Sequence, residues 1–208
     1  MVQNKPKRPR GRPRAYDPDQ ALAQARDVFW ASGYAAASLD QLGAATGMNR
    51  PSLYGAFGDK RGLYLKVLQR YGETSEALQA QALAGERGLR EELRQTYRAG
   101  LELYCSGEDG PRGCLLIACA LTDSAGDPEV RKLFAACLRD LDTRLEQRLR
   151  LARERGELRR DADPALLARQ ASSVLHSLAI RARAGESRKA MEKDIEFALD
   201  LICGPRKH

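Results

Sequence analysis

The chain is patterned for helices along almost its whole length. Apolar residues recur three or four positions apart in several long stretches, which places them on one face of an α-helix. One such stretch contains Leu89, Leu93, Tyr97, Leu101 and Tyr104. No segment alternates convincingly between apolar and polar residues, as a half-buried strand does. The 29 Leu and 31 Ala against 5 Val and 4 Ile also favour helices. The sequence therefore predicts an all-α protein.

The starts and stops of the pattern predict about nine helices. Residues that cap helix N-termini precede several of the apolar stretches, for example Asp17 before Pro18, Ser38 and Asn49. Glycines such as Gly33 and Gly47 end others. The predicted helices cover about residues 17–32, 39–45, 50–57, 60–84, 89–104, 114–124, 128–156, 164–184 and 187–202.

Residues 38–60 carry the most specific pattern. Two short predicted helices are joined there by a tight turn containing Gly47, which is typical of a helix-turn-helix. Leu42, Met48 and Leu53 are placed to pack behind these helices. An ordinary helical hairpin with a polar surface is the alternative to a DNA-binding unit.

In a helix-turn-helix the second helix enters the major groove, so its outward side chains are candidate DNA contacts. Arg50 is placed to reach a guanine edge. The hydroxyl groups of Ser52 and Tyr54 and the ammonium group of Lys60 suit phosphate oxygens. The predicted contact set is Ser38, Arg50, Pro51, Ser52, Tyr54 and Lys60.

The stretch GYAAASLDQLGAATGMNRPSLYGAFGDKRGLYLKVL resembles the DNA-binding domain of the TetR family of bacterial repressors. Its markers, within about residues 16–70, are Gly33-Tyr34, Ser38, Gly47, the Ser52-Leu53-Tyr54-x-x-Phe57 core and Asp59-Lys60. The chain departs from the family at Gly55 and Ala56, where members often carry larger contact residues. Base reading is therefore expected to depend on Arg50 and the N-terminal arm.

The resemblance implies a domain organisation and partners. Residues 1–15 would form a disordered basic arm, 16–62 a helix-turn-helix domain with three helices, and 63–208 a helical ligand-binding and dimerisation domain. The expected function is a repressor that binds a pseudo-palindromic operator in double-stranded DNA as a homodimer. A small-molecule effector would release it, and no cofactor is implied.

Charge is concentrated in the arm. The chain has a net charge of +7, and residues 1–14 hold six basic side chains and no acidic one, so the remainder is nearly neutral. The segment Pro9-Arg10-Gly11-Arg12-Pro13 resembles an AT-hook core, which lies extended in a narrow minor groove. We predict that Arg10, Arg12 and Arg14 contact DNA. A tail that gives only non-specific attraction is the alternative.

The last two helices are apolar over a wide arc, which fits the homodimer that the resemblance implies. The predicted interface residues are Leu167, Ala171, Val174, Leu178, Ile195, Leu199 and Ile202. The alternative for each is a place in the core of its own chain.

The effector is expected near Cys114, at the start of a predicted helix beside Arg112, where a thiol pKa is lowered. The stretch PRGCLLI resembles that of some relatives with a Gly-Cys at this point, which respond to electrophiles or oxidants. This resemblance implies an unsaturated aldehyde or acrylate-like acid as the expected class of effector. Tyr97, Tyr104 and His176 are further candidates for the ligand site. The alternative is that Cys114 is a small buried apolar residue and the others have core or surface roles.

Other functions are disfavoured. Five scattered cysteines and two histidines do not predict a metal site or disulfides, and they fit the reducing cytoplasm. No apolar run is long enough to cross a membrane, and no apolar segment behind the basic arm suggests a secretory signal. Two alternatives stay open: an architectural protein that prefers A·T-rich DNA, and an enzyme that uses a Cys114–His176 pair.

Overall fold

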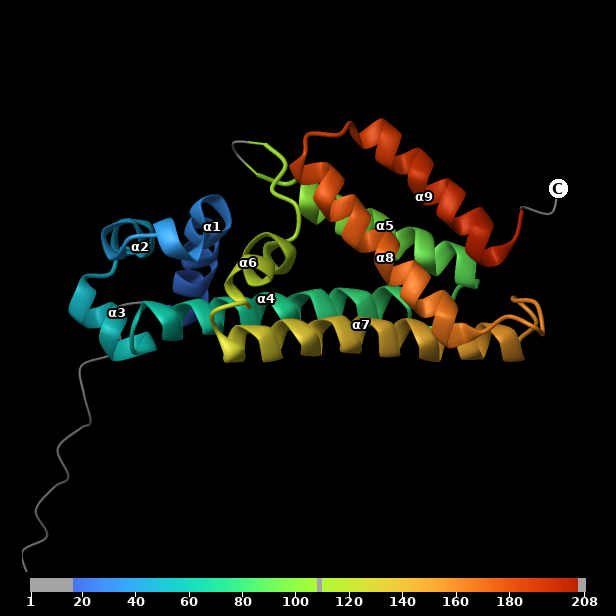
Figure 1. Cartoon of the computed structure of the whole chain (residues 1–208), viewed down its shortest axis with the longest axis horizontal. Coiled ribbons are helices and arrows are strands. Elements are labelled where there is room, and N and C mark those ends of the chain that lie inside the picture. Colours follow the sequence, from blue (N-terminus) through green and yellow to red (C-terminus); the bar gives the residue numbers. More distant parts are fainter. Residues whose placement is uncertain (1–16, 108–109, 206–208) are drawn as a thin grey trace, which may run out of the picture.

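The computed structural model describes residues 17–107 and 110–205, and every regular element in these residues is helical (Figure 1). A π-helical segment, η1 (Leu116–Ala120), directly precedes α6. The helices are α1 (Pro18–Ala36), α2 (Leu39–Thr46), α3 (Arg50–Phe57), α4 (Lys60–Ala82), α5 (Leu89–Cys105), α6 (Leu121–Asp123), α7 (Pro128–Glu154), α8 (Pro164–Arg183) and α9 (Arg188–Cys203). The prediction of an all-α protein with about nine helices is confirmed.

Two predicted boundaries differ from the structure in detail. α1 continues to Ala36, but Gly33 has φ 75° and ψ 170°, so the regular helix is broken at the predicted glycine. The single helix predicted for residues 114–124 is instead η1 followed by the short α6. A π turn adds one residue to the helical repeat, and apolar spacing over so few residues does not separate it from an α-helix.

The first of two apolar clusters, which we call the N-terminal core, is built around α1. Phe29 and Trp30 of α1 are almost completely buried in it, together with Leu42 of α2, Leu53 of α3 and Leu63 of α4. Side chains of η1 belong to the same cluster. The helix-turn-helix is therefore packed on α1 and α4 and is continuous with the segment after the predicted effector cysteine.

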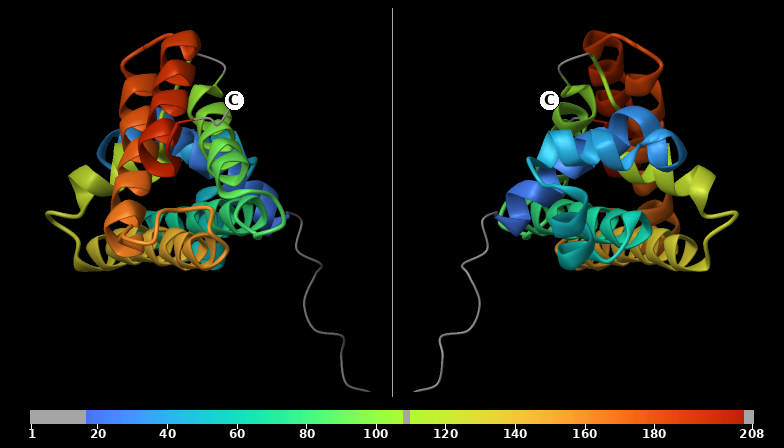
Figure 2. Two further views of the ribbon diagram at one scale, coloured as in Figure 1. Left: turned by 90° about the vertical axis from the view of Figure 1, so that its right-hand side faces the viewer. Right: turned by 90° about the vertical axis from the view of Figure 1, so that its left-hand side faces the viewer.

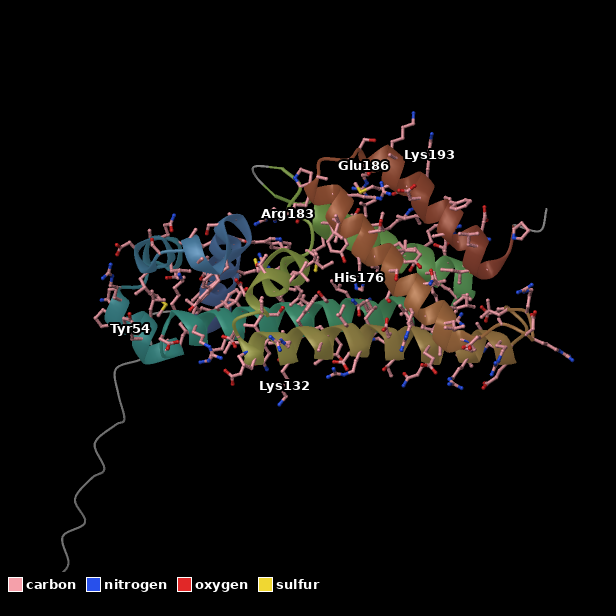
Figure 3. The ribbon with its side chains drawn as sticks, viewed as in Figure 1. Tyr54, Lys132, His176, Arg183, Glu186 and Lys193 are labelled. Carbon is pink, nitrogen blue, oxygen red and sulfur yellow. The ribbon has the colours of Figure 1, made fainter. Side chains whose placement is uncertain are left out.

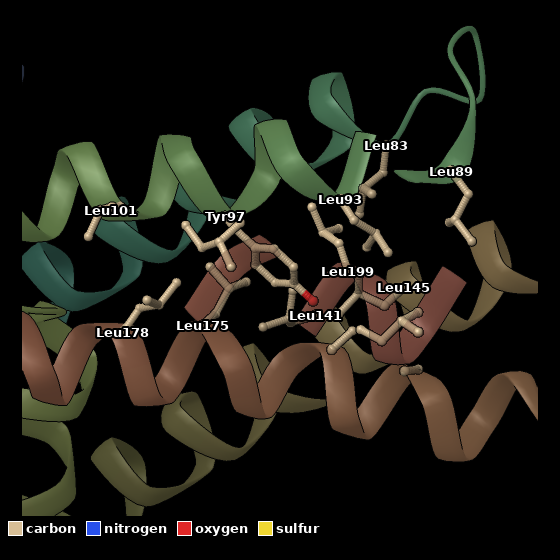
Figure 4. Packing of buried hydrophobic residues seen from close by; sticks show 14 of the residues in the cluster. Leu83, Leu89, Leu93, Tyr97, Leu101, Leu141, Leu145, Leu175, Leu178 and Leu199 are labelled. Atoms are coloured by element: carbon tan, nitrogen blue, oxygen red, sulfur yellow. The ribbon is translucent and has the colours of Figure 1, made fainter. Parts of the chain in front are cut away.

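The second cluster, the C-terminal core, lies between α5, α7, α8 and α9 (Figure 4). Leu93 and Tyr97 of α5, Leu145 of α7, Leu175 of α8 and Leu199 of α9 are all nearly inaccessible to solvent in it. α4 and α7 run side by side along the length of the molecule (Figures 1 and 2). α4 thus extends from the N-terminal core to the C-terminal core.

A buried ion-pair network crosses the C-terminal core. Arg148 of α7 is 3% exposed and donates to Glu92 of α5, which is fully buried, and to Glu157 at 3.0 Å. Glu92 also accepts from the Arg87 backbone N–H at 3.0 Å, and Glu157 accepts from the Leu89 N–H at 2.5 Å. The network therefore anchors the N-terminus of α5 to α7.

Candidate nucleic-acid interface and effector cavity

α2 and α3 form a helix-turn-helix at one end of the molecule, seen end-on in the right-hand view of Figure 2. The Ser38 hydroxyl accepts from the Gln41 N–H (3.1 Å) while the Gln41 side chain accepts from the Ser38 N–H (2.8 Å), a reciprocal capping box. Gly47 ends α2 with φ 63°. Asn49 caps α3 by accepting from the Ser52 N–H at 2.9 Å. The turn is held at both ends by these local bonds.

The exposed face of α3 carries the residues that the sequence predicts to contact DNA. Leu53 and Phe57 are buried against the rest of the domain, so the opposite face points to solvent. Tyr54 is 46% exposed and projects from the end of the molecule (Figure 3). The other exposed predicted contacts on α3 are Arg50, Pro51 and Ser52.

Arg50 is not free in this face. Its Nε donates to Oδ1 of Asp40 at 3.2 Å, and its Nη2 lies 2.8 Å from Oδ1 and 2.9 Å from Oδ2. Asp40 is the second residue of α2, so the pair joins the two helices across the turn. No sequence signal identifies Asp40 as the partner of Arg50, because only the fold brings the two side chains together.

The remaining predicted DNA contacts have mixed positions. The Lys60 ammonium donates to the Ala35 carbonyl oxygen at 3.3 Å and lies 4.6 Å from the centre of the Tyr34 ring, so it is directed towards the end of α1. Ser38 uses its oxygen in the α2 cap. Arg10, Arg12 and Arg14 lie outside the described residues.

A cavity of about 300 Å³ lies between α4, α7, α8 and η1. Its apolar wall includes Leu116, Phe134 and Leu175, and acidic side chains such as Glu76 and Asp140 lie at its exposed edge. Cys114, Tyr104 and His176 line it, so the structure brings three of the four predicted ligand residues together. Tyr97 does not line this cavity; its hydroxyl is buried in the C-terminal core without a partner among the described residues (Figure 4).

The prediction that Arg112 lowers the pKa of Cys114 is wrong. Burial raises the pKa of this thiol, and hydrogen bonds from the Ile117 backbone and the Tyr71 hydroxyl offset only part of the effect. The Arg112 side chain points away from the thiol, because it donates to the Ser106 carbonyl (3.1 Å) and to Asp27 (3.0 Å). Cys114 is therefore mainly a neutral thiol at neutral pH.

His176 is also held neutral, because burial lowers its pKa. Its ring points inward from α8 in Figure 3. A catalytic cysteine depends on a lowered thiol pKa and a base that accepts its proton. The raised pKa of Cys114 does not favour the Cys114–His176 enzyme.

Two further residues of the cavity could not be predicted from the sequence. Tyr71 of α4 donates to the Cys114 sulfur at 3.6 Å, and Cys137 of α7 lines the same cavity. Both lie among the apolar residues of their own helices. The Cβ of any residue replacing Gly72 would lie 3.1 Å from the Cys137 sulfur, so this glycine leaves room for the second thiol. The only sequence pattern at these two positions is the helical spacing of apolar residues. This spacing does not show which residues of other helices face them across a cavity.

A chain of direct contacts joins the cavity to the DNA-binding end. The Tyr71 ring, which contacts Cys114, meets Trp30 of α1 edge-on with ring centres 5.3 Å apart. Trp30 donates from Nε1 to the Arg112 carbonyl oxygen at 3.2 Å, and the Arg112 guanidinium lies over the Trp30 ring at 4.9 Å. Arg112 forms an ion pair with Asp27 at 3.0 Å. The segment leading to Cys114 is thereby attached to α1.

A second set of contacts lies beside the first. The Tyr64 hydroxyl of α4 donates to Asp123 of α6 at 2.6 Å, and Cys119 of η1 donates to the Phe29 carbonyl at 3.4 Å. Arg61, in the first turn of α4, donates to Asp127 at 2.6 Å. The pKa of Asp127 falls to about 2 chiefly because of this bond. The start of α4 is thereby connected to α6 and to the N-terminus of α7.

Comparison with known proteins places this architecture in a family. The model for "Bacterial regulatory proteins, tetR family" matches residues 21–67, and that for "Tetracyclin repressor-like, C-terminal domain" matches residues 91–197. The HTH-type transcriptional repressor ComR of Escherichia coli (strain K12) is 33% identical over 193 residues, which are 92% of this chain and 90% of that protein. The chain belongs to the TetR family.

Solved structures of TetR-family regulators have the same fold. A cysteine mutant of the regulator CifR, solved with 26-base-pair double-strand operator DNA, is 36% identical with a TM-score of 0.79. The match covers 90% of this chain and 98% of that one. The reduced form of E. coli NemR has a TM-score of 0.79 over 91% of this chain and 98% of that one, and at 19% identity it supports the fold alone.

The dimer residues predicted for this TetR-family chain have two environments. Leu167 and Val174 are partly buried at the edge of the C-terminal core. The others are buried in the core of their own chain, as the alternative interpretation expected: Ala171, Leu178, Ile195, Leu199 and Ile202. Large exposed apolar side chains on α8 and α9 are instead Leu166, Ile180, Phe197 and Leu201, each more than half exposed.

The described residues contain neither a candidate metal site nor a candidate membrane span. Among residues 17–107 and 110–205, no three His, Cys, Asp or Glu side chains are grouped so that they could hold a metal ion. No helix in this described part is both long and apolar enough to cross a bilayer.

Proposed function

We propose that the protein is a transcriptional repressor that binds a pseudo-palindromic operator as a homodimer and leaves it when a small molecule occupies the cavity. The observation that carries this proposal is the exposed face of α3, held by its capped turn at the end of the molecule. The operator complex of CifR and the repressor ComR, both above 30% identity, support it.

On DNA, α3 would lie in the major groove. Arg50 would reach a guanine edge, and Ser52 and Tyr54 would donate to phosphates on either side. Ser38, Pro51 and Lys60 would contact the backbone at the rims of the groove. Arg10, Arg12 and Arg14 would extend the contact into the neighbouring minor groove.

The homodimer would form through α8 and α9. The exposed Leu166, Ile180, Phe197 and Leu201 on these helices are apolar surface that a second copy would remove from water. Two recognition helices about 34 Å apart would then read two half-sites one helical turn apart. In this proposal residues 1–15 are the arm, 16–62 the DNA-binding domain and 63–208 the regulatory domain, and the protein acts in the cytoplasm with the chromosome.

The effector would be a small electrophile, an unsaturated aldehyde or an acrylate-like acid. Cys114 and Cys137 both line the cavity, and Tyr104 and His176 supply polar groups for a carbonyl oxygen. Addition of a thiol would form a sulfur–carbon bond at the β-carbon, and the thiol proton would end on the α-carbon. Tyr97 has no direct part in this site.

Binding of a ligand in the cavity would alter DNA binding through two routes. One is the set of contacts made by Tyr71, Trp30 and Arg112, and the other is η1. η1 supplies Leu116 both to the cavity wall and to the N-terminal core. A ligand that displaces η1 or Tyr71 therefore acts on the packing of α1 and α4, which carry the helix-turn-helix.

Footprinting of DNA upstream of the protein's own gene tests the proposal, with and without a panel of unsaturated aldehydes and acids. A symmetric footprint lifted by one compound in the wild type, but not in Cys114→Ser, is expected. Cys105→Ser is the matched control, because Cys105 is a partly buried thiol that does not line the cavity. A footprint that no compound lifts contradicts the effector class. Diffuse, A·T-biased binding contradicts the operator.

A further inference from the structure

The Arg50 guanidinium is oriented before any DNA arrives. Its Nε and Nη2 both face Asp40, at 3.2 and 2.8 Å from Oδ1, with a third contact of 2.9 Å to Oδ2. Arg50 is the first residue of α3 and Asp40 the second of α2, each just after a capped helix start. The backbone positions that carry the two side chains are therefore fixed by the fold of the turn.

This contact leaves Nη1 of the guanidinium unused among the described residues. Arginine has five N–H donors in one plane, and the side edge, formed by Nε and Nη2, is the one that Asp40 accepts from. On the outer edge, Nη1 has no hydrogen-bond partner among the described residues, while Nη2, which shares that edge, donates to both oxygens of Asp40. Two parallel donors on such an edge match O6 and N7 of guanine.

We propose that Asp40 is a specificity-determining residue: it holds Arg50 so that the outer guanidinium edge meets one guanine in each half-site. The inference rests on the proposed operator binding and adds a residue that touches no base in this role. A long side chain normally loses rotamer freedom when it binds. Here Asp40 already orders the Arg50 side chain in the free protein, so less rotamer freedom is lost on binding. A correctly placed guanine therefore gains more binding free energy than a base that cannot accept these hydrogen bonds.

The position of Asp40 argues against a purely structural role. The side chains of Arg50 and Asp40 are 57% and 78% exposed, and an ion pair this exposed to water contributes little to folding stability. An acid on the DNA-facing surface also repels phosphates and weakens binding to every sequence. Asp40 thus has opposite effects on overall affinity and on discrimination, and the two can be measured separately.

The experiment uses the full chain and a duplex that the wild type selects from a random DNA pool. Equilibrium affinities are measured for this duplex, for each symmetric single-base-pair variant, and for an unrelated duplex of the same length. The proteins are wild type, Asp40→Ala, Arg50→Ala and the double variant. Asp19→Ala is the matched control, because Asp19 is also the second residue of its helix and its ion pair is with Arg70 instead.

The wild type is expected to prefer guanine at one half-site position by about tenfold or more. Asp40→Ala should lose most of this preference and bind the unrelated duplex more tightly, and it should change no preference when Arg50→Ala is already present. An unchanged preference for guanine in Asp40→Ala overturns the proposal. An increased preference also overturns it, because it would show that Asp40 only keeps Arg50 from contacting DNA. An equal loss in Asp19→Ala also overturns it. Failure of the wild type to select any duplex contradicts operator binding itself.

Discussion

Arg112 and Asp27 form an ion pair of 3.0 Å that joins the segment before the cavity cysteine to the first helix of the DNA-binding end. The Arg112 carbonyl also accepts from Trp30 of α1 at 3.2 Å and from Arg183 of α8 at 3.0 Å. One residue thus contacts α1 and α8 at the same point. A shift of this segment changes contacts in both halves of the molecule.

Replacement of Arg112 by Ala should weaken the response to the effector more than it weakens DNA binding. The variant loses the ion pair and the contact over Trp30, together about 1–2 kcal/mol of folding stability. The factor by which saturating effector lowers operator affinity should fall about fivefold or more, within the usual range of coupling energies. Fluorescence anisotropy with labelled operator measures both affinities. Arg98→Ala, which removes an ion pair with Glu192 between residues that do not line the cavity, should leave the factor unchanged.

Alkylation of Cys114 should be slow at neutral pH and accelerate above pH 8.5. Burial raises the pKa of this thiol above that of a free cysteine, about 8.5, so little thiolate is present at pH 7. Tyr71→Phe removes a hydrogen bond that lowers the pKa, so the variant should react more slowly still at pH 8. Mass spectrometry of the iodoacetamide-treated protein against pH gives both rates. Faster labelling in Tyr71→Phe would mean that the hydroxyl mainly blocks access.

The same shift has a consequence for stability. The folded state keeps the thiol proton at a pH where the unfolded chain has lost it, so Cys114 favours folding below pH 8.5 and this contribution is lost as pH rises. Burial likewise raises the pKa of Cys119 to about 11. Both thiols therefore lower the free energy of unfolding as the pH rises in alkaline solution.

Much of the fold and part of the site could be predicted from local sequence patterns. Helical spacing, caps such as Asn49 and breaks such as Gly47 are short-range signals, and they gave correct elements because each is decided within one or two turns of chain. The direction of Arg112 is decided by Asp27, 85 residues away, which no spacing encodes. Apolar spacing also cannot tell core from interface: Leu199 was a candidate for both, and it is fully buried in one chain.

Glu92→Gln should destabilise the fold by about 3–5 kcal/mol. Glu92 is fully buried and accepts from Arg148, so its loss leaves a buried guanidinium without its main counter-charge. Urea denaturation followed by circular dichroism measures the free energy of unfolding. Glu146→Gln is the control, since it breaks an exposed pair with Arg150 and should cost less than about 1 kcal/mol. Equal effects in the two variants would show that the buried network adds no stability.

Deletion of residues 1–14 should weaken operator binding without abolishing its specificity. The segment carries six basic side chains, and each that neutralises a phosphate releases counterions on binding. The slope of log K against log salt should therefore become less negative by up to about five. Affinities between 50 and 200 mM salt, roughly the range over which such slopes are determined, provide the measurement. Complete loss of sequence preference would favour an architectural protein that binds through the arm.

Phe197→Glu should convert the protein to monomers. Phe197 and Leu201 lie four residues apart on α9 and are 66% and 69% exposed, so in a single chain both side chains contact water. A second copy that covers them would have to bury the new carboxylate without a partner, which costs several kcal/mol and raises the dimer dissociation constant at least about tenfold. The fold should persist, because the position contributes no buried apolar contact to the C-terminal core. Leu121→Glu is the matched control: it introduces the same charge at an apolar residue that is 58% exposed on α6. Sedimentation velocity at micromolar concentration separates the outcomes. A dimer that survives Phe197→Glu but dissociates with Leu121→Glu would move the interface from α9 to α6, and the spacing of the two recognition helices would have to be derived from that face instead.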